Sequence, residues 1–137
     1  MQFRLTFEEI QQLIQRRAGR SVPIIYGGPH TVRVAYDVNV LFKQASVGID
    51  ITVDRINGSD IFLSYSGGAA IEFMLRSALG HIKNQPGANI IEMLDGNRLL
   101  LSLGKNPQVA QVFNAVEIND IHFDEQYAMI DFTPKNL

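Results

Sequence analysis

The residues whose types and spacing best suit catalysis or metal binding form one short run, Asp120-Ile121-His122-Phe123-Asp124. Residues two apart share one face of a β-strand, so an extended backbone would place the side chains of Asp120, His122 and Asp124 side by side. Two carboxylates and an imidazole in that arrangement are typical of a divalent-cation site or of an acid–base pair. These three residues are therefore the candidate catalytic or metal-binding residues of the chain.

The same run has a simpler interpretation, in which Ile121 and Phe123 face the core and the polar side chains face water. The apolar phase shifts between Ile118 and Ile121, which predicts a β-bulge near Asn119. The sequence motifs of phosphate-binding loops, dinucleotide-binding folds, zinc proteases and EF-hands are absent. The sequence therefore favours a non-catalytic protein with no metal ion and no cofactor. The 120–124 run is the candidate site under the alternative hypothesis of an enzyme or a metal-binding protein.

Composition excludes several classes of protein. The chain has 137 residues and a formal net charge of -2, so it lacks the basic surface typical of proteins that bind nucleic acid. It contains no cysteine, which excludes disulfides, thiolate zinc sites and thiol catalysis. Neither a signal-like apolar run nor a stretch of about 20 apolar residues is present, which predicts a cytoplasmic protein with no membrane span. The length fits one domain over residues 1–137.

The candidate residues must be positioned by the elements around them, which begin with a helix. A short N-terminal helix is predicted within residues 1–20. Its signals are a capping box of Thr6 and Glu9 and a terminating Gly19. Residues 21–30 carry two prolines and a Gly-Gly pair, and they predict an irregular connector.

Strands dominate the rest of the predicted elements. Alternating apolar residues indicate two long strands, 31–43 and 46–56, which form a hairpin with a bulge near its end. A third strand over 61–65 follows the turn sequence Asn57-Gly58-Ser59-Asp60. The remaining predicted elements are a hairpin of 89–94 with 98–103, a short helix over 108–113, and a hairpin of 116–123 with 127–132.

A long apolar helix is predicted over residues 69–83, where apolar residues recur at helical spacing in a wide stripe. A strand of about 12 residues spans about 40 Å, which exceeds the diameter of a domain of this size, so the long strands must curve. We therefore predict an α+β fold. In it, a strongly curved antiparallel sheet packs around the long apolar helix within residues 31–133, and the short N-terminal helix precedes them.

From about residue 31 to residue 133 this pattern resembles one lobe of the tubular lipid-binding superfamily. The segments that carry the resemblance are the two long strands, the helix 69–83, and residues 99–103, 116–118 and 129–132. The resemblance implies that a bent sheet wraps an apolar helix and holds lipid between them. The chain departs from the superfamily in lacking the export signal common among bacterial members and in having an extra N-terminal helix.

Three functional hypotheses follow. The first is a non-catalytic module that binds a lipid or another apolar small molecule in a groove between sheet and helix. The second is a structural or interaction domain with a packed core, which binds a protein partner or a second copy of itself as a homodimer. The third is an enzyme or metal site in the 120–124 run. The predicted walls of the groove are Val40, Ile51, Met74 and Ile82.

Overall fold

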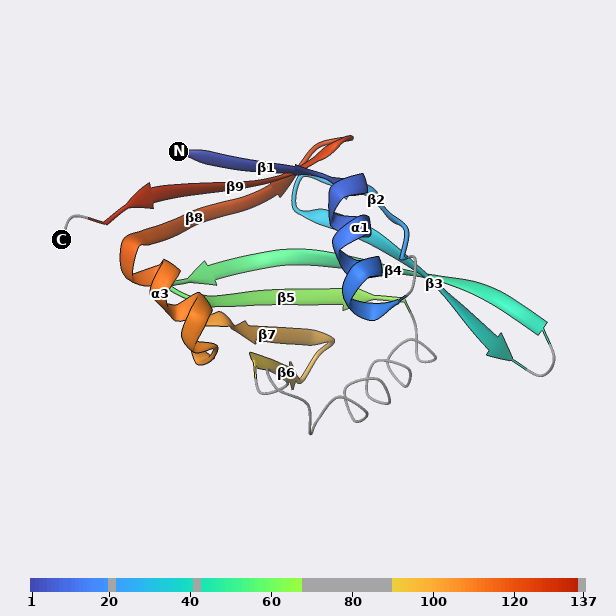
Figure 1. Ribbon diagram of the computed structural model, residues 1–137. Helices are drawn as coiled ribbons and strands as arrows, with labels where there is room; N and C mark the ends of the chain where they lie inside the picture. Colours follow the sequence, from blue (N-terminus) through green and yellow to red (C-terminus); the bar gives the residue numbers. More distant parts are fainter. Residues whose placement is uncertain (20–21, 41–42, 68–89, 136–137) are drawn as a thin grey trace.

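The computed structural model describes residues 1–19, 22–40, 43–67 and 90–135, which form two antiparallel sheets (Figure 1). The three-stranded sheet, in the order β1-β9-β8, consists of β1 (Gln2–Thr6), β8 (Val116–Phe123) and β9 (Tyr127–Pro134). The six-stranded sheet has the order β2-β3-β4-β5-β7-β6. Its strands are β2 (Ile24–Gly28), β3 (Thr31–Val40), β4 (Lys43–Asn57), β5 (Asp60–Ser66), β6 (Ile91–Leu94) and β7 (Arg98–Ser102).

Within the described residues, two α-helices accompany the sheets, α1 (Phe7–Ala18) and α3 (Pro107–Ala115). α1 follows β1 and contacts β2, and α3 leads from the 3-10 turn η2 (Leu103–Lys105) into β8 (Figure 1). The predicted capping box is confirmed, because the Thr6 hydroxyl accepts the Glu9 N–H at 3.0 Å and the Glu9 carboxylate accepts the Thr6 N–H at 3.1 Å. Hydrogen bonds from Thr6 to the Glu9 carboxylate lower the pKa of Glu9. Neither helix in the described part of the chain has the length and apolar character needed to cross a membrane.

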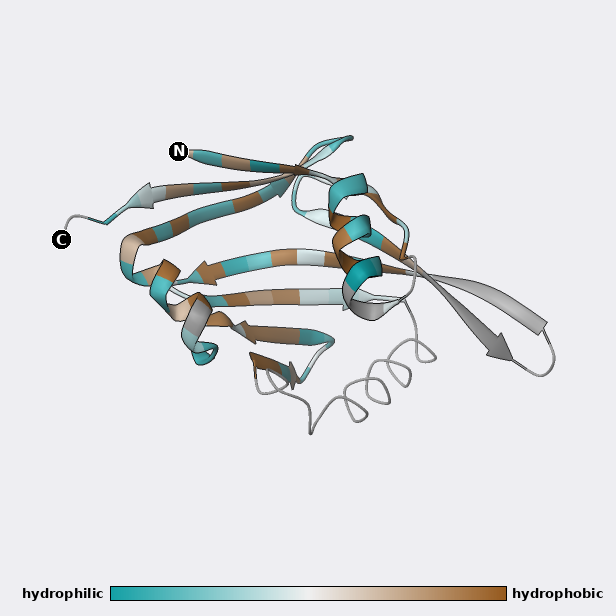
Figure 2. Ribbon diagram, in the orientation of Figure 1, coloured by the Kyte–Doolittle hydropathy of each residue, from teal (hydrophilic) through white to brown (hydrophobic). Residues whose placement is uncertain are grey.

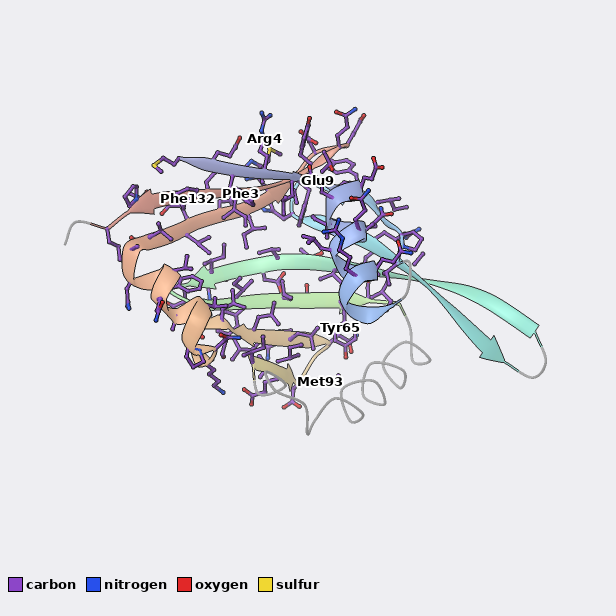
Figure 3. The ribbon with its side chains drawn as sticks, viewed as in Figure 1. Phe3, Arg4, Glu9, Tyr65, Met93 and Phe132 are labelled. Carbon is purple, nitrogen blue, oxygen red and sulfur yellow. The ribbon has the colours of Figure 1, made fainter. Side chains whose placement is uncertain are left out.

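One cluster of buried apolar side chains lies on the six-stranded sheet. Its buried members are Ile49, Tyr65 and Leu99, and the partly buried side chains packed against them are Ile51, Leu63 and Met93. Alternate residues of β4 and β5 contribute to it, as the period of a strand requires, and Figure 2 shows apolar and polar residues alternating along the strands. Tyr65 and Met93 are labelled in Figure 3. Ile49 and Ile51 lie in the segment predicted as the second long strand, and Leu63 and Tyr65 lie in the segment predicted as the third.

Most of the predicted strands are confirmed. The long predicted hairpin is the β3–β4 pair, and the third predicted strand is β5. The β6–β7 and β8–β9 hairpins and helix α3 occupy the segments predicted for them. The bulge expected near the end of the second long strand shifts the register of β4 between Val53 and Arg55.

The predicted fold class is wrong. One curved sheet around a long apolar helix was expected, whereas the described chain is mostly strand and divides into two sheets. Its two α-helices have 12 and 9 residues, and neither is a long apolar helix packed against a sheet. The helix predicted over 69–83 lies outside the described residues. The single-sheet prediction failed because it placed the last hairpin in the same sheet as the long strands, while β9 pairs with β1.

Strand β2 was also missed, because residues 21–30 carry the signals of a connector. β2 pairs with β3 and forms an edge of the six-stranded sheet. Edge strands tolerate glycine and proline better than central strands do, since one side of the backbone needs no ladder partner. The Pro23 and Gly27-Gly28 signals therefore mark the ends of a short edge strand rather than an unstructured segment.

Candidate metal centre

The turn between β2 and β3 joins the two sheets. The carbonyl of Pro29 accepts the N–H of Phe123 in β8 at 2.7 Å, and the carbonyl of His30 accepts the N–H of Val53 in β4 at 2.8 Å. The ring nitrogen Nδ1 of His30 lies 3.1 Å from the carbonyl oxygen of Ile121. The turn thus bonds to the free edge of β8 on one side and to β4 on the other, which fixes β8 beside the six-stranded sheet.

A bulge in β8 determines which of its side chains share a face. The register of the β8–β9 pair shifts between Ile118 and Asp120, which confirms the bulge predicted near Asn119. The Asn119 side chain donates to the Thr133 hydroxyl at 2.7 Å. Beyond the bulge Asp120 stands opposite Asp131 of β9. Residues two apart on β8 then bring His122 to the same face as this pair of carboxylates.

Asp120, His122 and Asp131 form a compact cluster, called the DHD cluster below. His122 Nδ1 lies 3.3 Å from Asp120 Oδ2 and 3.5 Å from Asp131 Oδ2, and one ligand atom from each residue lies within 4.8 Å of the others. The other oxygen of Asp131 accepts from the Gln2 side-chain amide of β1 at 3.0 Å. All three strands of the small sheet therefore contribute to holding the cluster.

The His122 Nδ1 atom is buried and has no hydrogen-bond partner, although two carboxylates lie close to it. Buried polar atoms are rarely left unpaired in folded proteins. Ligand atoms about 2.1 Å from a tetrahedral metal ion are about 3.4 Å apart, which matches both distances from Nδ1. The two distances from Nδ1 therefore fit ligands of one ion, and a ligand oxygen of each carboxylate lies within 4.8 Å of the other.

Asp124, the third residue of the predicted trio, lies apart from the DHD cluster in the turn between β8 and β9. Its Oδ1 accepts the backbone N–H groups of Gln126 at 2.8 Å and Tyr127 at 2.7 Å. These two bonds hold the pKa of Asp124 below its usual value. The structure thus brings together two of the three candidates, Asp120 and His122, and Asp131 takes the place expected of Asp124.

Neutralising Asp124 is expected to change stability in a pH-dependent way. Asp124→Asn keeps an oxygen acceptor for the turn and removes the charge. Because the folded-state pKa is lowered, the charge stabilises the fold above the unfolded-state pKa of about 3.9 and this contribution disappears as the pH falls through the folded-state pKa. Urea unfolding should show the variant less stable at pH 6 and equal to wild type in strong acid. A constant difference across this range would contradict the assignment.

Of the four predicted groove residues, only Ile51 has a described side chain. Ile51 packs against the core cluster. The side chain of Val40 lies outside the described residues, as do Met74 and Ile82. The lipid-groove hypothesis therefore remains a prediction without a described site.

Two residues near the site were not singled out from the sequence. Asp131 is a lone acid in an apolar strand, and His30 lies in the segment interpreted as a connector. His30 Nδ1 is 3.8 Å from Asp120 Oδ1, so it borders the DHD cluster without joining it. The chain matches no protein-family model, and no curated protein or solved structure is similar enough to it to count as a match.

Proposed function

We propose that this protein is a non-catalytic module that binds a divalent transition-metal ion through Asp120, His122 and Asp131. The observation that carries the proposal is the buried Nδ1 atom of His122, which faces two carboxylates without a hydrogen bond to either. An unpaired buried polar atom costs about 1–3 kcal/mol. A metal ion removes that cost, because it binds the nitrogen lone pair and both carboxylates at once.

An ion pair explains the same geometry less well. His122 Nδ1 lies within ion-pair distance of both carboxylates, at 3.3 and 3.5 Å, but it forms a hydrogen bond with neither. If the Nδ1 atom of a neutral imidazole carries the lone pair, it cannot form a hydrogen bond with either carboxylate, since an ionised carboxylate only accepts hydrogen bonds. Three lone-pair-bearing atoms, one nitrogen and two carboxylate oxygens, then lie close together, which is unfavourable unless a cation lies between them.

The donor set indicates which ions would bind. One imidazole nitrogen with two carboxylate oxygens suits Zn²⁺, Fe²⁺ and Mn²⁺, and affinity for such sites generally rises from Mn²⁺ to Zn²⁺. Ca²⁺ and Mg²⁺ prefer oxygen ligands alone. The expected order of affinity is therefore Zn²⁺ above Mn²⁺, with Ca²⁺ and Mg²⁺ weakest.

Isothermal titration with Zn²⁺ tests the proposal with two isosteric variants. Asp131→Asn removes a carboxylate from the DHD cluster, and Asp124→Asn removes one from the neighbouring turn. Loss of a ligand should weaken binding by about a hundredfold or more, since even residues that only support a ligand contribute about 10–100-fold. Asp124→Asn should bind Zn²⁺ as wild type does. Absence of Zn²⁺ binding, or equal losses in the two variants, would contradict the proposal.

A further inference from the structure

The outer side of β1 pairs with no strand of the described chain, because β1 lies at one edge of the three-stranded sheet and its neighbour there is β9 (Figure 1). Met1 and Phe132 exchange both backbone hydrogen bonds, at 2.9 and 2.8 Å. Antiparallel ladders alternate between bonded and non-bonded pairs, so the N–H and C=O groups of Gln2 and Arg4 point away from β9. These backbone groups are therefore available to another strand.

The other three sheet edges of the described chain are bonded or shorter. At the edge of β8, the Phe123 N–H donates to the Pro29 carbonyl. At the edge formed by β2, helix α1 contacts the strand and the Gln11 amide donates to the Ile24 carbonyl at 3.2 Å. β6 has four residues. Proteins commonly protect edge strands with a covering element, a proline or a bulge. β1 contains no proline, and its register with β9 runs without a bulge.

The side chains of β1 leave its edge open. Met1 and Phe3 share one face of the strand and are 73% and 51% exposed, which is unusual for large apolar residues. Arg4 lies on the opposite face, and its guanidinium is 5.1 Å from the centroid of the Tyr127 ring of β9. Phe3 and Arg4 are labelled in Figure 3. The charge of Arg4 is thus held over the sheet and does not block the approach of another strand.

We infer that β1 pairs antiparallel with β1 of a second copy of this chain, about a two-fold axis at Phe3. This register places Phe3 opposite Phe3 and Met1 opposite Leu5, so the apolar residues of one face meet each other. On the other face Gln2 stands opposite Arg4, and each such pair exchanges two backbone hydrogen bonds. The two three-stranded sheets then form one continuous sheet. Cross-strand aromatic and apolar pairs stabilise such pairings.

Charge favours this register and a second copy as the partner. Shifting the register by two residues would place Arg4 opposite Arg4, and like charges directly opposite each other destabilise a strand pair. In the inferred register, Arg4 lies opposite the neutral Gln2 of the second copy, whose neighbour on β9 is Asp131. The first charge beyond Gln2 is therefore a carboxylate. The inference does not depend on metal binding, because no residue of β1 belongs to the DHD cluster.

Sedimentation velocity of the whole protein tests the inference. Pairing of two five-residue strands gives an interface below the about 1,000 Å² expected of stable complexes, so the dimer should be weak. The measurement therefore covers about 1 µM to 1 mM protein. We expect the sedimentation coefficient to rise with concentration from that of a monomer to that of a dimer. A monomer at every concentration would overturn the inference, including the case in which β1 accepts a strand from a different protein.

Phe3→Asp tests the centre of the pairing. The substitution exchanges an aromatic pair for two like charges directly opposite each other, so it should raise the dimer Kd by about tenfold or more. Ile25→Asp is the matched control, because Ile25 is a similarly exposed apolar residue, at 55%, on β2 at the edge of the other sheet. The control should dimerise as wild type does. An equal or larger loss of dimer in Ile25→Asp would contradict pairing through β1.

Arg4→Pro tests the backbone bonds separately. The Arg4 N–H points away from β9, so proline at this position removes no bond of the β1–β9 ladder but removes half of the hydrogen bonds between the two copies. Arg4→Ala loses the same side chain and keeps the N–H. We expect Arg4→Pro to dimerise about tenfold or more weakly than Arg4→Ala, with urea unfolding showing that both variants fold. Equal dimer Kd values in two folded variants would contradict strand pairing, and Phe3→Asp decides the case in which the proline variant does not fold.

Discussion

Replacing His122 with glutamine is expected to abolish the stabilisation of the protein by Zn²⁺. A ligand that binds only the folded state stabilises it by about 2.7 kcal/mol when its free concentration is about 100 times its Kd. His122→Gln removes the nitrogen that lies between the two carboxylates, so the variant should unfold at the same urea concentration with and without Zn²⁺. Urea unfolding of both proteins, with and without the ion, measures this difference.

His30→Gln provides the control for that experiment. His30 lies 3.8 Å from Asp120 but is not one of the three clustered ligands. The His30 variant should therefore keep most of the stabilisation by Zn²⁺. Equal losses in the two histidine variants would show that His30 contributes as much as His122 and contradict a site formed by the DHD cluster alone.

Replacing Leu99 with alanine is expected to lower the free energy of unfolding by about 2–5 kcal/mol, the usual cost of removing a buried leucine side chain. Leu99 is buried against Ile49 and Tyr65, and its strand β7 pairs with both β5 and β6. Leu99→Met retains most of the volume and should cost less than about 1.5 kcal/mol. Urea unfolding of the three proteins measures both values.

Leu13→Ala is the surface control for the core experiment, since Leu13 is 49% exposed on α1. Substitutions at such positions usually change stability by no more than about 0.5 kcal/mol. A similar effect of Leu13→Ala and Leu99→Ala would show that the cluster around Leu99 is not the stabilising core.

Local patterns predicted the local pairings. The apolar alternation of β3, β4 and β5, and the turns between successive strands, involve neighbours in the sequence and were visible in it. The pairing of β1 with β9 joins the two ends of the chain, from Gln2↔Asp131 to Thr6↔Tyr127. Residues 2–6 are few and run directly into the capping box of α1, so the strand has no separate signal. The division into two sheets followed from this one long-range pairing and could not be deduced from local patterns.

Two of the three residues of the DHD cluster were candidates from the sequence, and the third was missed for a similar reason. Asp120 and His122 lie on one strand, so the period of two brought them together on sequence grounds alone. Asp131 faces them because the β8–β9 turn pairs Phe123 with Ala128, and the register then runs without a break to the Asp120–Asp131 pair. A shift of one residue in that register would turn the carboxylate of Asp131 to the other face of the sheet. The exact register of the turn is not encoded in its composition, and Asp124 was chosen for its spacing alone.

Nitrogen-15 NMR of the histidine rings, recorded with and without Zn²⁺, tests the central claim most directly. Nδ1 of His122 faces the two carboxylates, so this nitrogen should bind the ion while Nε2 carries the proton. We expect the Nδ1 signal of His122 to shift on addition of a stoichiometric amount of Zn²⁺ and its Nε2 signal to remain that of a protonated nitrogen. An unchanged His122 spectrum, or coordination through Nε2, would contradict a metal site formed by Asp120, His122 and Asp131.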